Sequence, residues 1–169
     1  MKKHRQKGKK GNFFKDKFKR FKRRQDKEKF KREREYSNVL IKMIDMYDPQ
    51  EEDWMGFKLA INNTYTFHHI RERRNGGKEV VQNGAILTHF GHQFLNHLDS
   101  HNKRAYNDYQ EIFKRINKSQ GPIDDDLRED IYGMMLDVFY YNIYGISKDV
   151  LSFYEPFIRA RAKTKVKKL

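Results

Sequence analysis

Six of the seven histidines of this sequence lie within one segment, residues 64–101. His68 and His69 are adjacent there, and Asn83 follows fourteen residues after His69. His92 comes nine residues after Asn83. A neutral imidazole can ligate a divalent metal ion, or it can take a proton from water near pH 7. These residue types therefore indicate metal-assisted proton transfer as the chemistry of the segment.

A strand, a loop, a second strand and a helix are predicted to position these side chains. Residues 64–70 are β-branched and aromatic, which favours a strand. Asn75-Gly76-Gly77 is a strong turn signal, and residues 85–88 can form a short returning strand. A helix should begin at His89, because the apolar residues that follow recur at helical spacing: Phe90, Phe94, Leu95 and Leu98. A unit this small lacks a core of its own, so flanking helices must support it.

These elements should bring three candidate ligands together. Adjacent strand residues point to opposite faces, so His68 and His69 should meet different surroundings. His92 and Asn96 are four residues apart and share one helix face. A hairpin folded onto that helix can gather His68, His92 and Asn96 around a divalent ion. His69 would stand alongside as the imidazole that removes a proton from water.

At this point the segment resembles the HNH, or ββα-metal finger, endonucleases, which include the nuclease domains of DNA-degrading colicins and many small phage enzymes. His68-His69, Asn83, His92 and Asn96 match the family pattern in order and spacing. The resemblance implies that His69 is the general base and that Asn83 braces the loop and orients His69. It also implies that His68 and His92 hold the metal, with Asn96 as a weaker third ligand. The family reaction is metal-assisted hydrolysis of a phosphodiester.

The cofactor implied by the resemblance is a divalent metal ion. The position one turn after His92 holds Asn96 instead of a histidine, which favours a weakly held ion. We therefore expect Mg²⁺ or Mn²⁺, with Zn²⁺ or Ni²⁺ as alternatives.

Each of the further polar residues near the site has two possible interpretations. Four cations in the loop either clamp substrate phosphates or are solvated loop charges: Arg71, Arg73, Arg74 and Lys78. His89 either contacts a phosphate or is a polar residue of the first helical turn. His97 and His101 have the i, i+4 spacing of a metal-binding pair, but an exposed helix face is the simpler interpretation because no third ligand is visible.

The formal net charge of +14 is concentrated at the two ends of the chain. Residues 1–35 hold 18 Lys/Arg and 5 Asp/Glu, and residues 159–169 hold six Lys/Arg and no acid. Blocks of like charge are typical of tails that bind polyanions, of which nucleic acid is the commonest. We expect DNA in preference to RNA as the partner. A protein partner for the basic arm is the alternative.

Composition also excludes several classes of protein. The chain has no cysteine, which removes disulfides, thiolate nucleophiles and Cys-ligated zinc. No stretch approaches the roughly 20 apolar residues of a membrane span. The basic N-terminus is not followed by the apolar segment of a signal peptide. The sequence therefore predicts a cytoplasmic protein with no membrane partner. The resemblance to the HNH endonucleases implies an enzyme of the kind that a phage or mobile element encodes in a bacterial host.

The fold predicted is mainly α with an embedded ββα-metal hairpin-helix finger, an α+β arrangement. Five regions follow one another: a basic arm that is disordered or conditionally helical (1–35), a helical lead-in (36–63), the finger (64–101), a helical support (102–158) and a basic tail (159–169). Within the lead-in, residues 50–63 should form a short amphipathic helix. Later helices are expected near 103–118, from Asp124 to about Tyr144, and from Ser147 onward.

The function predicted from these features is a metal-dependent endonuclease that hydrolyses DNA, with a basic arm that binds nucleic acid without sequence preference. Two other classes remain open. The first is a non-catalytic nucleic-acid-binding or ribonucleoprotein component in which the finger is only a scaffold. The second is an assembly factor whose arm docks on an acidic partner. Metal-dependent cleavage would separate the first from an enzyme, and salt-dependent retention of nucleic acid would argue against the second.

Overall fold

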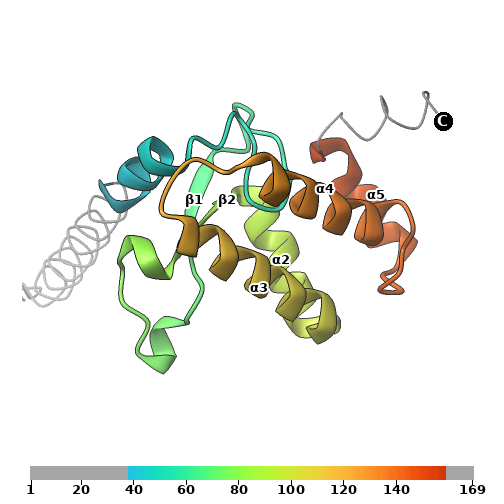
Figure 1. Cartoon of the computed structure of the whole chain (residues 1–169). Coiled ribbons are helices and arrows are strands. Elements are labelled where there is room, and N and C mark those ends of the chain that lie inside the picture. Colours follow the sequence, from blue (N-terminus) through green and yellow to red (C-terminus); the bar gives the residue numbers. More distant parts are fainter. Residues whose placement is uncertain (1–37, 159–169) are drawn as a thin grey trace, which may run out of the picture. The chain divides into compact units, whose positions relative to one another are not determined.

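The computed structural model describes residues 38–158, so the predictions made for the arm and the tail lie outside the described residues. Figure 1 follows the chain from a first helix, residues 38–47, through a hairpin to a series of helices. The further elements are β1 (Tyr65–His69), β2 (Gly84–Thr88), α2 (His89–His101), α3 (Lys103–Ser119), α4 (Asp125–Phe139) and α5 (Lys148–Tyr154), with short 3-10 turns η1 (Arg73–Asn75), η2 (Val81–Asn83) and η3 (Glu155–Phe157).

The described part of the chain is mainly helical with one small antiparallel sheet, as the sequence predicted. β1 pairs with β2 in a register that sets His68 opposite Ala85 and His69 opposite Gly84. α2 begins directly after β2, so one short run of chain supplies both the second strand and the helix behind it. The order of strand, loop, strand and helix expected from residues 64–101 is confirmed.

An aromatic core joins the lead-in segment to α2 and α3. Trp54 is fully buried, and its ring meets Tyr47 edge-on with centroids 5.0 Å apart. Trp54 also packs against Phe113 of α3. Phe57 contacts Phe94 of α2 in the same way. These large rings come from the lead-in, α2 and α3, and their burial removes apolar surface from water. The hairpin adds Phe67, Ile86 and Leu87 to the buried residues.

The predicted helix at residues 50–63 is wrong. The segment is a loop in which Gln50 and Glu51 have positive φ, which no α-helix accommodates. The buried carboxylate of Asp53 accepts hydrogen bonds from the backbone N–H groups of Met55 and Phe57, both at 2.9 Å. These local bonds satisfy backbone donors that a helix would otherwise have paired. The turn buries Trp54, Met55 and Phe57, whereas Leu59 and Ile61 are exposed.

The helices of the 102–158 region begin where their caps predict. Asp124 caps α4 by accepting a hydrogen bond from the Leu127 N–H. α4 ends at Phe139 and not near Tyr144, because the Asn142 side chain bonds both the N–H and the C=O of Ile146 and thereby forms a turn. Ser147 is the N-cap residue of α5, although its side chain makes no capping bond.

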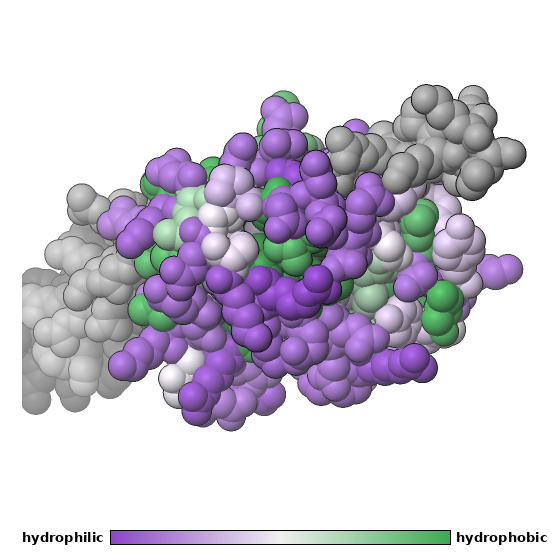
Figure 2. All heavy atoms as spheres, in the orientation of Figure 1, coloured by the Kyte–Doolittle hydropathy of each residue, from purple (hydrophilic) through white to green (hydrophobic). Residues whose placement is uncertain are grey.

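The surface of the described residues is polar over most of the face in Figure 2, and the hydrophobic side chains form small patches scattered across it. Tyr141 and Ile143, in the connection between these helices, are 67% and 59% exposed. Between residues 38 and 158, no helix combines the length and the apolar character needed to cross a bilayer.

Candidate functional site

Two predicted metal ligands, His68 and His92, face each other in the structure. His68 lies on β1 and His92 lies one turn into α2. The Nδ1 atom of His68 is 3.3 Å from the Nε2 atom of His92, and the ring planes are nearly perpendicular. The hairpin places them together because α2 starts at the residue after β2 and folds back across the sheet. The convergence expected from strand and helix spacing is therefore present.

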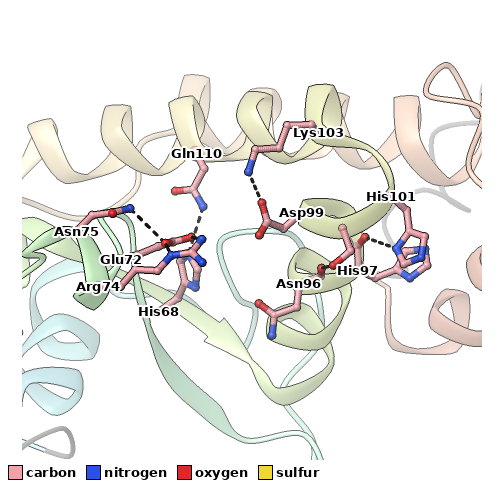
Figure 3. Close-up of polar contacts among 11 residues, drawn as sticks. His68, Glu72, Arg74, Asn75, Asn96, His97, Asp99, His101, Lys103 and Gln110 are labelled. Atoms are coloured by element: carbon pink, nitrogen blue, oxygen red, sulfur yellow. Dashed lines mark hydrogen bonds and ion pairs between the residues drawn. The ribbon is translucent and has the colours of Figure 1, made fainter.

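Each ring of this pair has a polar neighbour on its other nitrogen. The Nε2 atom of His68 is 3.2 Å from the amide nitrogen of Gln110, which reaches down from α3 as Figure 3 shows. The Nδ1 atom of His92 is 3.3 Å from the hydroxyl oxygen of Thr66 on β1. Both rings are thus held at both of their nitrogen atoms.

Burial keeps both rings uncharged. His68 is 7% exposed, and desolvation, helped by the nearby His92 and His69, lowers its pKa to about 3. Desolvation also lowers the pKa of His92, with smaller contributions from His89 and His69. A neutral imidazole has a lone pair available for a metal ion, whereas an imidazolium has none. The surroundings therefore favour the ligating form at neutral pH.

His69 occupies the opposite face of β1, as adjacent strand residues must. Its Nε2 atom accepts a hydrogen bond from Arg73 Nε at 3.3 Å and lies 4.0 Å from a carboxylate oxygen of Glu79. Arg73 and Glu79 form an ion pair of 2.8 Å beside the ring. Burial lowers the pKa of His69, and Glu79 opposes this by raising it. The predicted general base is thus a neutral imidazole whose acceptor nitrogen is in contact with an arginine.

Asn83 ties together the two sides of the loop that follows His69. Its side-chain oxygen accepts from the Arg71 N–H at 2.7 Å, and its amide nitrogen donates to the carbonyls of Arg71 and Lys78 at 3.0 and 2.9 Å. Its backbone carbonyl accepts from the Ile70 N–H. The predicted bracing of the loop is present. These bonds are to backbone groups of Ile70, Arg71 and Lys78, so Asn83 acts on the main chain that follows His69.

A glycine makes this loop possible. A Cβ atom on Gly77 would fall 1.7 Å from the Arg71 carbonyl oxygen and 2.9 Å from the Asn83 amide nitrogen. Only a residue without a side chain allows the backbone to pass so close to the bracing asparagine. The Gly76-Gly77 turn read from the sequence is therefore part of the brace.

Asn96 does not join the histidine pair. It lies one turn after His92 on α2, is exposed, and its side chain makes no hydrogen bond to either ring among the described residues. His89 is also exposed, at the start of the helix. His97 and His101 stack with centroids 4.3 Å apart at the far end of α2 (Figure 3), and in the described chain no group of three ligating residues includes them.

The three loop arginines all have partners within the loop. Arg71 donates from Nε to the Asn75 carbonyl at 2.8 Å. Arg74 pairs with Glu72, which also accepts from Asn75 (Figure 3). Together with the contact of Arg73 to Glu79, these bonds fix the loop in the absence of substrate. Lys78 is exposed.

The pair of imidazoles fits the metal that the sequence resemblance implies. A tetrahedral ion with metal–nitrogen bonds of about 2.0–2.1 Å separates two nitrogen ligands by about 3.3 Å. The two facing nitrogens of His68 and His92 are 3.3 Å apart. A buried acceptor, the Gln110 side-chain oxygen, has no hydrogen-bond partner among residues 38–158. The pair thus supplies two ligands, and among residues 38–158 no third His, Asp or Glu side chain completes a group around it, so the remaining ligands would come from water or substrate.

Two residues of the site were not predicted from the sequence. Gln110 and Asn117 interrupt the apolar face of α3, and both are buried. Gln110 meets His68, and Asn117 donates to the Gly84 carbonyl at the start of β2 while accepting from Tyr47. Two amides seven residues apart on one apolar face are a signal that something polar lies opposite.

Comparisons of the chain with protein-family models, curated proteins and solved structures gave no match.

Proposed function

We propose that this protein is a metal-dependent endonuclease of the HNH type that hydrolyses phosphodiester bonds of DNA. The observation that carries the proposal is the pair of neutral imidazoles, His68, which is buried, and His92, which is half-buried, with facing nitrogens 3.3 Å apart. A third imidazole, His69, is the next residue on the same strand, and Asn83 braces the loop beyond it. The hairpin and α2 form the ββα unit that would carry the reaction.

His68 and His92 would hold the metal through the nitrogens that face each other. When bound, a divalent ion supplies stabilisation of the negative charge on the phosphate and on the leaving oxygen. Mg²⁺ and Mn²⁺ are the ions expected from the resemblance. Two imidazole ligands favour Zn²⁺ and Ni²⁺ as the bound ion, because imidazole suits these ions better than it suits Mg²⁺.

His69 would remove the proton from the attacking water. Because Arg73 donates to its Nε2 atom, Nε2 is the nitrogen with the free electron pair and Nδ1 carries the hydrogen. Arg73 must therefore move before His69 can act on water. A substrate phosphate competes with Glu79 for this guanidinium, so binding of the scissile strand would release the base and clamp the phosphate in one step.

Two basic ends would supply affinity for the substrate. The described residues include the site, whereas the excess of positive charge lies in residues 1–35 and 159–169. Contacts of lysine and arginine with backbone phosphates carry no sequence information, so we propose non-specific binding that weakens steeply with salt. We propose that the protein acts on DNA in the cytoplasm. The biological setting that we propose is a bacterial host in which a phage encodes the enzyme.

A non-catalytic nucleic-acid-binding role is the second candidate. One observation favours it: the side chain of His69 is only 13% exposed, beneath the ion pair of Arg73 and Glu79. If that pair stays closed on substrate, the hairpin is a scaffold and the basic arm provides the function. The two roles differ in whether DNA is cut.

Cleavage of supercoiled plasmid in Mg²⁺, Mn²⁺, Zn²⁺ or Ni²⁺ tests the proposal. We expect nicked or linear product that EDTA prevents, no product with His69→Ala, and unchanged product with His97→Ala. The second substitution is a matched control, since His97 lies on α2 away from the pair. DNA binding by His69→Ala should equal that of the unchanged protein. An absence of cleavage with all four ions, together with retained binding, would establish the scaffold role instead.

A further inference from the structure

The hydrogen-bond partners around the pair decide which nitrogens carry hydrogen. The Thr66 hydroxyl lies 3.0 Å from the Leu87 carbonyl, which can only accept, so the single hydrogen of the hydroxyl is used there. The contact of Thr66 with His92 Nδ1 at 3.3 Å must then have the hydroxyl as acceptor. His92 therefore carries its hydrogen on Nδ1, and its Nε2 atom is a bare electron pair aimed at His68.

The His68 ring can face that electron pair in either of two tautomers. In the first, His68 carries its hydrogen on Nδ1 and donates it to His92. The His68 Nε2 atom then accepts from the Gln110 amide nitrogen at 3.2 Å, and the amide oxygen of Gln110 remains buried without a partner among the described residues. A buried oxygen without a hydrogen-bond partner destabilises this arrangement.

In the second arrangement, His68 carries its hydrogen on Nε2 and the Gln110 amide turns over about its last side-chain bond. The amide oxygen then accepts from His68 Nε2 and gains a partner, while the amide nitrogen gives up its contact with His68. The nitrogens of His68 and His92 now face each other as two bare electron pairs. That is unfavourable for two rings alone and is the donor arrangement that a metal cation requires.

We infer that Gln110, on α3 outside the ββα unit, is a positioning residue that selects the metal-binding tautomer of His68 by turning its amide, as Thr66 selects that of His92. The inference rests on the proposed metal site. It assigns to Gln110 the outer contact that metal-bound histidines make in proteins through their second ring nitrogen. It also makes α3 part of the metal site, although the residues that match the family pattern end before this helix.

Substitutions of Gln110 that differ only in hydrogen-bonding character test the inference. Gln110→Met has similar length and neither donates nor accepts strongly. Gln110→Glu keeps an acceptor for the His68 Nε2 hydrogen and loses the donor. If Gln110 acts by accepting, zinc affinity in the full chain falls roughly 10–100-fold in Gln110→Met and is retained or increased in Gln110→Glu. Gln93→Met and Gln93→Glu, at an exposed position of α2, are the matched controls and should leave affinity unchanged.

Nitrogen-15 NMR of the histidine rings gives a readout that a purely structural role would not produce. In the unchanged protein, added Zn²⁺ should move the His68 hydrogen from Nδ1 to Nε2, while the His92 hydrogen stays on Nδ1. Equal zinc affinity in Gln110→Met and the unchanged protein, or a His68 hydrogen that stays on Nδ1 with zinc bound, would overturn the role of Gln110 and leave the metal site standing. An unchanged protein that binds none of Zn²⁺, Ni²⁺, Mn²⁺ or Mg²⁺ would overturn the proposed site itself.

Discussion

Asp53 and Thr88 join the lead-in loop to the start of the helix that carries His92. The Asp53 carboxylate accepts from the Thr88 N–H at 2.7 Å and from the Thr88 hydroxyl at 2.8 Å. The same hydroxyl caps α2 by accepting from the Gly91 N–H. A Cβ atom at Gly91 would lie 2.1 Å from the carboxylate, so this approach requires glycine. The position of His92 therefore depends on a carboxylate 39 residues earlier in the chain.

Loss of this cap should destabilise the fold. Thr88→Val removes a hydroxyl that is fully buried, donates to Asp53 and accepts from the α2 backbone. We expect the free energy of unfolding in urea to fall by about 2 kcal/mol, because buried partners are left unpaired. Ser147→Ala is the control, since Ser147 is an N-cap residue whose side chain makes no capping bond. Equal losses in the two variants would contradict the assigned role of Thr88.

Stability should fall as the pH falls below neutrality. Burial lowers the pKa of His68 to about 3 and lowers those of His92 and His69. Unfolded imidazoles take up protons near pH 6.5, so below that pH the unfolded chain binds more protons than the folded one. The stabilisation is complete above about pH 6.5 and is lost as the pH falls toward the folded pKa values, by up to about 1.4 kcal/mol per pH unit for each ring.

Asp53 opposes this trend over part of the range. Burial raises its pKa to about 6, so the folded chain holds that proton at pH values where the unfolded chain has released it. Urea unfolding at several pH values between 7.5 and 5 measures the sum. His68→Gln should give a shallower loss toward acid than the unchanged protein, whereas Gln93→Ala, at an exposed position and without a titrating group, should give the same slope. Parallel slopes for all three proteins would show that His68 is not held neutral.

Asn83 should affect cleavage without affecting the metal pair. Asn83→Ala removes one accepted and two donated hydrogen bonds that join Arg71 to Lys78. We expect cleavage to fall roughly 100-fold, because a small displacement of a catalytic group is enough for such a loss. Zinc affinity should stay within about twofold, since the bonds of the Asn83 side chain are to the backbone of Arg71 and Lys78 and not to the rings of the proposed ligands. Asn75→Ala, in the same loop, should cleave at a nearly unchanged rate.

Metal should stabilise the folded protein through His92. At a free Zn²⁺ concentration of about 100 times Kd, the free energy of unfolding should rise by about 2.7 kcal/mol. Thermal unfolding with and without Zn²⁺, followed by addition of EDTA, measures the effect and its reversal. His92→Ala should remove it and His97→Ala should not. A shift of equal size in His92→Ala would place the ion elsewhere.

The basic arm should govern affinity for DNA. Deletion of residues 1–35 removes 18 Lys/Arg and 5 Asp/Glu. We expect weaker DNA binding and a smaller dependence of affinity on salt, because fewer counterions are released. Filter binding at several salt concentrations measures both quantities. Zinc affinity of the truncated chain should be unchanged, and an unaltered salt dependence would argue that the arm binds a protein instead.

The sequence alone determined the elements whose signals are local. β-branched residues ending in His68-His69, the glycine turn and the apolar spacing after His89 predict strand, loop and helix, and the structure has them. The opposite orientation of His68 and His69 follows from the two-residue period of a strand. The placement of His68 near His92 follows from a hairpin that leads directly into a helix. In each case the residues that decide the outcome are close together in the chain.

Tertiary structure decided what depends on distant residues. Gln110 reaches His68 across 42 positions, and Asp53 reaches Thr88 across 35. Periodicity says which residues of α3 are buried but not which polar group lies opposite them. For the same reason a run of helix-compatible residues at 50–63 became a loop once Asp53 bonded to its own backbone and to Thr88. Buried polar groups take whichever partner the packed fold presents, and packing brings together residues that no local pattern relates.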